Sequence, residues 1–204
     1  MNETRQILAL YTIGHSTHPI ERFIRLLKQN EIKAVGDVRS SPFSRFNPQF
    51  NRESLTRSLK ENGIHYVFLG EELGARRVES ECYVGNKVSY ALIAKLPLFR
   101  KGIERLKDGA KKMRVTIMCA EKDPITCHRT ILVAKEAKSE FRDIFHILEN
   151  GSLETHDQAE ERLLASYHVN EADLFLPREK RLEDAYQLRA GEIAYEENLQ
   201  PAYN

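Results

Sequence analysis

The sequence has few cysteines and no long apolar segment. Three cysteines occur in 204 residues. An odd number in a chain of this size argues against a disulfide scaffold and for a reducing, cytoplasmic setting. No run approaches about 18 consecutive apolar residues, so no membrane span is expected. The N-terminus lacks a cationic segment followed by an apolar core, and we therefore predict no signal peptide.

An excess of charge of one sign is also missing. The chain carries 31 basic and 30 acidic side chains, which gives a formal net charge of +1. This balance argues against a protein that coats nucleic acid, although a local basic patch remains compatible with it. Neither GxGxxG after the first predicted strand nor GxxxxGK[ST] is present, so no cofactor is predicted.

Apolar segments alternate with amphipathic ones along the chain. Five segments read as strands: 7–13, 34–38, 65–69, 115–119 and 143–148. The segments that read as helices are 19–30, 51–63, 90–106 with a bend at Pro97, 124–138, 155–167 and 180–198. This alternation predicts an α/β fold, with a mainly parallel five-stranded sheet and helices on both faces, similar to a Rossmann fold. We expect a core domain over residues 1–150 and a helical C-terminal extension over residues 151–204.

Polar residues follow the predicted strands where each strand ends. In parallel sheets, ligands bind beyond the carboxyl ends of the strands. We therefore expect residues that are distant in sequence to form one site on one rim, with Arg39 and Arg129 on the same side of the sheet. The residues in question are His15, Ser16, Asp37, Arg39, Glu71, Glu72, Arg76, Cys119 and Glu121.

The densest group of reactive side chains lies in residues 114–129, RVTIMCAEKDPITCHR. A buried strand is expected to end near Cys119, and a helix is expected to begin at Asp123-Pro124 or Thr126. This places Cys127 and the next two residues in the first helical turn. Free N–H groups and the helix dipole there stabilise anions and lower thiol pKa values.

Several of these residues also have purely structural interpretations. Cys119 is either a core residue or a second thiol for redox exchange with Cys127. A metal site formed by these two cysteines with His128 and His15 is conceivable, but the spacing matches none of the usual zinc patterns, and we predict none. His15 and Ser16 are a base and a hydroxyl, or turn residues bonded to the local backbone. Asp37 with Arg39 either orients the substrate or forms a structural ion pair.

A long loop over residues 40–51, SSPFSRFNPQFN, separates the second strand from the next helix. Its phenylalanines, together with Arg45 and neighbouring arginines, can bind single-stranded nucleic acid by stacking and phosphate contact. The more ordinary interpretation is a solvated loop whose phenylalanines pack into the core. Cys82 is expected in another loop, without a functional role.

The ordered set of motifs in this chain resembles the DUF488 family of uncharacterised proteins. The matching motifs are YTIGHS (11–16), DVRSSPFSRFNPQF (37–50), LGEELGARR (69–77), MCAEKDPITCHR (118–129), DLF (173–175) and GEIAY (191–195). The chain carries Ala75 where the family often has a second glycine. The resemblance supports the location of the site and leaves its chemistry open.

These observations predict an enzyme that acts on an anionic, phosphate- or nucleotide-like substrate. The expected catalytic residues are Cys127, His128, Cys119, His15, Asp37 and Glu121. Cys127 is the nucleophile or redox thiol, a histidine carries the proton, and the two carboxylates orient these groups or act as acid and base. The expected substrate-binding residues are Arg39, Arg129, Ser16, Arg45 and Arg76. The alternatives are a nucleic-acid-binding or DNA-repair-associated module that uses loop 39–57, and a ligand sensor without turnover.

Overall fold

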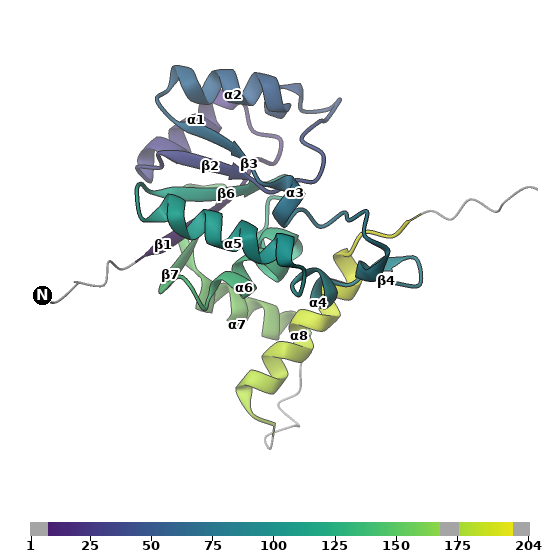
Figure 1. Cartoon of the computed structure of the whole chain (residues 1–204). Helices are drawn as coiled ribbons and strands as arrows, with labels where there is room; N and C mark the ends of the chain where they lie inside the picture. Colours follow the sequence, from purple (N-terminus) through teal and green to yellow (C-terminus); the bar gives the residue numbers. More distant parts are fainter. Residues whose placement is uncertain (1–7, 168–175, 198–204) are drawn as a thin grey trace, which may run out of the picture.

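The structure is a computed structural model that describes residues 8–167 and 176–197. At its centre lies a six-stranded sheet with the strand order β3-β2-β6-β1-β7-β8 (Figure 1). The strands are β1 (Ala9–Gly14), β2 (Ala34–Asp37), β3 (His65–Phe68), β6 (Val115–Cys119), β7 (Asp143–Ile147) and β8 (Leu153–Thr155). Five of them are parallel, and β8 runs antiparallel to β7. The predicted α/β class and the five predicted strands are confirmed, and β8 is an additional edge strand.

Helices cover both faces of the sheet (Figure 1). The helices are α1 (Ile20–Gln29), α2 (Arg52–Glu61), α3 (Gly70–Leu73), α4 (Tyr90–Ile93), α5 (Pro97–Ala110), a π-helical segment (Arg129–Ala134) that continues into α6 (Lys135–Ala137), α7 (His156–Ser166) and α8 (Arg178–Ile193). Side chains of α1 and α2 share one hydrophobic cluster with Met118 of β6, whereas α5, α7 and α8 share the other with Ile117. Neighbouring residues of a buried strand thus supply the two cores, because successive side chains point to opposite faces.

The predicted helix over residues 90–106 is wrong in one respect, because it consists of two separate helices. Leu96 takes an extended conformation (φ −62°, ψ 135°) and α5 begins at Pro97. The ring of a proline disfavours helical dihedrals in the residue before it, so the chain breaks there instead of bending. A short hairpin formed by β4 (Tyr83–Val84) and β5 (Lys87–Val88) precedes α4 in the chain.

The helix predicted to begin at Asp123-Pro124 or Thr126 also differs. A single 3-10 turn occupies Pro124–Thr126, with the Asp123 carboxylate accepting the N–H of Ile125 at 3.2 Å. Cys127 is then extended (φ −135°, ψ 142°), and its carbonyl accepts the N–H groups of the residues three and four further on. Cys127 therefore lies at the N-cap of the helix, and the first turn begins at His128.

The C-terminal part packs against the sheet core. A capping box at Thr155 with Gln158 begins α7, as predicted. Ala185 and Tyr186 of α8 are buried in the same hydrophobic cluster as α5. The division of the chain near residue 150 stays a prediction. Residues 173–175 of the family motifs, and the predicted strand and helix ends at residues 7 and 198, lie outside the described residues.

In the described part of the chain, no helix is both long enough and apolar enough to cross a membrane.

Candidate functional site

A cavity of about 550 Å³ opens at the carboxyl ends of β1, β2 and β6. This is the edge at which ligands bind in parallel α/β sheets. Its wall contains seven of the residues expected to form the site: His15, Arg39, Arg76, Cys119, Glu121, Cys127 and His128. It also contains Tyr90, Tyr195 and several serines of the loop after β2.

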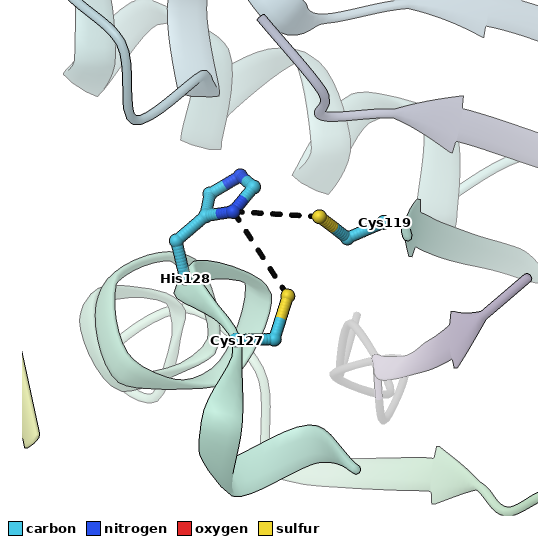
Figure 2. Close-up of side chains that lie close together, drawn as sticks. All are labelled: Cys119, Cys127 and His128. Carbon is cyan, nitrogen blue, oxygen red and sulfur yellow. Dashed lines mark hydrogen bonds between the residues drawn. The ribbon is translucent and has the colours of Figure 1, made fainter. Parts of the chain in front are cut away.

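Two thiols and an imidazole converge on this wall (Figure 2), and the carboxylate of Glu121 lines it beside them. His128 Nδ1 lies 3.4 Å from Cys119 Sγ and 3.9 Å from Cys127 Sγ. The Oε2 atom of Glu121 lies 2.9 Å from each of the two sulfur atoms. One carboxylate oxygen therefore faces both thiols, and both are placed to donate to it.

The orientation of the His128 ring is fixed by the backbone of the neighbouring strand end. Its Nε2 atom lies 3.0 Å from the carbonyl oxygen of Val38. Because a carbonyl only accepts hydrogen bonds, Nε2 must carry a proton. In the neutral ring, Nδ1 is then the atom with the free lone pair, and it points at the two sulfur atoms (Figure 2).

The two thiols have opposite pKa shifts. Burial by itself raises the pKa of Cys127, but the hydrogen bond from Cys119 and the positive charges of Arg129 and His128 bring it well below its usual value. Burial, followed by the neighbouring Cys127, raises the pKa of Cys119 well above its usual value. The backbone N–H of Arg129 also donates to Cys127 Sγ, at 3.4 Å. Negative charge is therefore favoured on Cys127.

The pKa values of His128 and Glu121, the neighbours of this thiol, are both raised. Burial lowers the pKa of His128, but the hydrogen bond and charge of Cys127 raise it overall. Burial, with the nearby Cys127, raises the pKa of Glu121. A proton shared within the group is thus better held by the imidazole or the carboxyl than by Cys127.

Asp37 and Arg39 form a buried ion pair at the cavity, in which Arg39 lines the wall and Asp37 lies behind it. Arg39 donates from Nε to Asp37 Oδ1 at 2.9 Å and from Nη2 to Oδ2 at 2.6 Å. The same guanidinium donates to Phe50 O at 2.8 Å and contacts His15 Nε2 at 3.1 Å. Asp37 itself does not line the cavity. Four of the five guanidinium N–H groups are therefore used, and the fifth, on Nη1, has no partner among the described residues.

His15 has no ring nitrogen free for proton transfer in this arrangement. Its Nδ1 lies 2.8 Å from Ser16 O and its Nε2 faces Arg39, which can only donate. The ring is also stacked on Phe50, with centroids 4.3 Å apart. Burial, together with the nearby Arg39, lowers its pKa to about 4, so the ring is neutral at pH 7. His15 therefore positions Arg39 in this structure, and the role of proton carrier stays a prediction.

Arg129 does not occupy the position expected of an anion clamp. Its side chain is fully buried, and it donates to Glu121 O at 2.6 Å and to Lys122 O at 3.1 Å. It lies on the same rim as Arg39 but beneath the segment that follows β6, away from the cavity wall. Its guanidinium therefore holds the loop that carries Glu121.

Of the other residues expected to bind the substrate, one lines the cavity and two do not. Arg76 lines the cavity, and its guanidinium carbon lies 5.0 Å from the centre of the Tyr195 ring. Ser16 and Arg45 do not line it, and Arg45 is exposed. In the loop after β2, Phe50 is buried whereas Phe43 and Phe46 are 67% and 88% exposed, so the phenylalanines pack into the core only in part.

Sequence reasoning missed two aromatic residues of the wall and misplaced one cysteine. Tyr195 reaches the cavity because its carbonyl accepts the N–H of Val88 at 3.0 Å, a contact that no local motif signals. Tyr90 begins α4 and is buried beside the two thiols. Cys82, expected in a loop, is fully buried in the 3-10 turn Ser80–Cys82.

The described residues include one group that could hold a metal ion at this wall. The donor atoms of Cys119, Cys127 and His128 all lie within 4.8 Å of one another. His15, which the sequence placed in the conceivable metal set, does not belong to this group.

Comparison with known proteins identifies a family. The model of the domain of unknown function DUF488 matches residues 19–135, which is more than half of the chain. No curated protein matches. Two crystal structures of a DUF442 protein from Shewanella putrefaciens CN-32, described as a candidate phosphatase, align with TM-scores of 0.35. Their identities are 11% and 12%, and the alignments cover 96% of this chain and 93% and 90% of theirs.

Proposed function

This chain belongs to the DUF488 family, and we propose that it is an enzyme that acts on an anionic, phosphate- or nucleotide-like small molecule with Cys127 as its nucleophile. One observation carries the proposal. Cys127 Sγ lies at the start of a helix, accepts the backbone N–H of Arg129, and faces the Nδ1 of His128 on the wall of an open cavity.

The surroundings of Cys127 suit a thiolate. A thiolate, not a thiol, is the nucleophilic form of cysteine, and helix N-termini and neighbouring cations favour it. Cys119 is placed to donate to Cys127, and His128 is placed to accept the proton that Cys127 loses. In this proposal His128 returns that proton to the leaving group.

Glu121 lies beside both thiols on the cavity wall, where a bound substrate would meet it. Its Oε2 atom lies 2.9 Å from each sulfur, and its raised pKa, caused by burial and by Cys127, eases protonation. A neutral carboxyl repels an anionic substrate less than a carboxylate does. Glu121 is therefore proposed as an acid that is uncharged when the anion is bound.

Two arginines are available to the anion. Arg39 offers the Nη1 N–H that has no partner among the described residues, and Arg76 lines the same cavity. The hydroxyl of Ser40 accepts the backbone N–H of Arg76 at 2.9 Å, which ties the segment after β2 to the segment after α3. A phosphate group is recognised well by such charge-assisted donors. Because the chemistry needs reduced thiols, we place the enzyme in the cytoplasm.

Alkylation with iodoacetamide, read for each cysteine by mass spectrometry, tests the proposal. Cys127 is expected to react in the folded protein, and millimolar inorganic phosphate is expected to slow the reaction. Cys82 is the internal control, because it is fully buried outside the cavity. The proposal fails if Cys127 reacts no faster than Cys82 or if phosphate has no effect. Protection by phosphate without turnover of any phosphate ester or nucleotide favours a ligand sensor instead.

A nucleic-acid-binding function is the second candidate, supported by the exposure of Phe43 and Phe46 on either side of exposed Arg45. Aromatic rings and arginines on one loop can stack bases and contact phosphates. Phosphate contacts release counterions, so affinity for a labelled single-stranded oligonucleotide should fall steeply with salt. Absence of binding at low salt removes this candidate.

A further inference from the structure

We propose that Cys119, Cys127 and His128 form a zinc-binding site with three protein ligands and a fourth position that faces the cavity. The inference rests on the proposed function in one respect, since the ion takes the same thiol that is proposed as the nucleophile. Zinc at this position would withdraw Cys127 from nucleophilic chemistry. Zinc is therefore expected to inhibit any reaction of that thiol.

The distances between the donor atoms fit a tetrahedral ion. Zn–S bonds of about 2.3 Å and Zn–N bonds of about 2.0–2.1 Å place a sulfur and a nitrogen about 3.5 Å apart in tetrahedral geometry. The observed separations from His128 Nδ1 are 3.4 Å to Cys119 Sγ and 3.9 Å to Cys127 Sγ. All three atoms lie within 4.8 Å of one another (Figure 2). An ion can thus be reached by all three donors with small side-chain adjustments.

The orientation of His128 is a second, independent observation. Metal-bound histidines almost always donate their other ring N–H to a carbonyl or carboxylate, which fixes the ring and its tautomer. His128 Nε2 lies 3.0 Å from Val38 O, and this contact leaves the lone pair of Nδ1 directed at the sulfurs. The second partner that a zinc ligand needs is therefore already present.

The backbone holds the donors in place before any ion binds. Cys119 ends the buried strand β6 and is paired with Gly14 of β1. Cys127 and His128 follow a 3-10 turn that the Asp123 carboxylate caps. Preorganisation of this kind means that binding requires little rearrangement of the chain.

The chemistry of the donor set selects among ions. Thiolates with an imidazole suit zinc, whereas magnesium and calcium prefer oxygen ligands. Three protein ligands with an open fourth position are typical of zinc sites that also bind water or another ligand. Glu121 lines the cavity beside both sulfurs and loses its two hydrogen bonds when the thiols are deprotonated by the metal. Binding must therefore release protons.

Cobalt titration of the reduced, metal-free protein tests the site directly. We expect one equivalent of Co²⁺ to give tetrahedral d–d bands and thiolate-to-cobalt charge-transfer absorption, and one equivalent of Zn²⁺ to abolish both. Cys119→Ser and Cys127→Ser should each weaken binding by more than the roughly 10- to 100-fold typical of changing a residue that only orients a metal ligand. His65→Gln is the matched control, because His65 is exposed at the opposite end of the parallel strands.

Two readouts separate this proposal from the proposed function. If cobalt gives no thiolate charge-transfer absorption in the wild-type protein, the zinc site is refuted, while phosphate protection of Cys127 from alkylation can still stand. If zinc binds but phosphate does not protect Cys127, the proposed function fails and the zinc site stands. Zinc should also protect Cys119 and Cys127 from alkylation together, and a chelator should restore their reactivity. The wild-type spectrum decides the matter even where a serine variant does not fold.

Discussion

The buried ion pair between Asp37 and Arg39 allows a quantitative test of how the cavity rim is held. The side chains of Asp37 and Arg39 are 0% and 8% exposed. Removing one partner of a buried pair costs about 3–5 kcal/mol, because the other charge remains buried without compensation. In the Arg39 variant, Asp37 would still accept hydrogen bonds from the backbone N–H of residue 39 and from the hydroxyl of Tyr66. These bonds measure 3.1 Å and 2.9 Å in the wild type. Arg39→Gln should therefore lower the free energy of unfolding by about 3 kcal/mol, the lower end of that range.

A double-mutant cycle measures the coupling within this pair. Urea unfolding followed by circular dichroism is measured for the wild type, Asp37→Asn, Arg39→Gln and the double variant. Since the double variant leaves no uncompensated charge, its cost should be smaller than the sum of the single costs by at least about 1 kcal/mol. The control is Lys180→Gln, which removes a surface pair with Asp184 and should leave the free energy of unfolding nearly unchanged. The reasoning would be refuted if each single variant lost less than about 1 kcal/mol and the loss in the double variant equalled their sum.

Two further predictions concern the same rim. Burial lowers the pKa of His15 to about 4, so between about pH 6.5 and 4 the unfolded chain binds a proton that the folded chain does not. The free energy of unfolding should therefore fall as the pH is lowered through this window. In urea unfolding, His15→Gln should make this fall smaller. A Cβ at Gly14 would lie 1.9 Å from Glu121 O, so Gly14→Ala should displace the segment that carries Glu121 and cost about 1–3 kcal/mol. The control is Gly109→Ala in α5, where the added Cβ would meet only Val115 Cγ1, at 3.9 Å; it should be neutral or stabilising. Equal thermal unfolding midpoints for the two alanine variants would contradict this explanation.

The sequence predicted the sheet well because each parallel strand is a short apolar run next to an amphipathic helix. β6 is buried along its whole length, and such segments are recognisable from composition alone. β8 escaped prediction because it has three residues, Leu153–Thr155, and pairs only at the sheet edge. A strand of that length has no period that a pattern can reveal.

The site was predicted less completely, because sequence position does not show which polar atoms are already used. Asp37, His15 and Arg129 were expected at the rim, and they are there. The carboxylate of Asp37 and the ring of His15 are already engaged by other groups of the chain, and Arg129 donates from both Nη atoms to backbone carbonyls. A metal site was not predicted, because the sequence spacing of Cys119 and Cys127 matches no common zinc pattern. A strand end and a helix N-cap bring these thiols together through tertiary contacts.

The donors and lone pairs that the chain leaves unused therefore limit what the site can bind more than its charged residues do. Arg39 keeps one N–H for a ligand, and His128 keeps one lone pair, directed at two sulfurs. A nucleophilic thiol and a zinc site make different demands on that lone pair, since the first needs it to take a proton and the second needs it to bind the ion. Both demands cannot be met at the same time. Zinc and a thiol-directed reagent must therefore compete for Cys127 if both proposals hold, and alkylation that proceeds unchanged in the zinc-loaded protein would contradict the assignment of His128 and Cys127 to one ion.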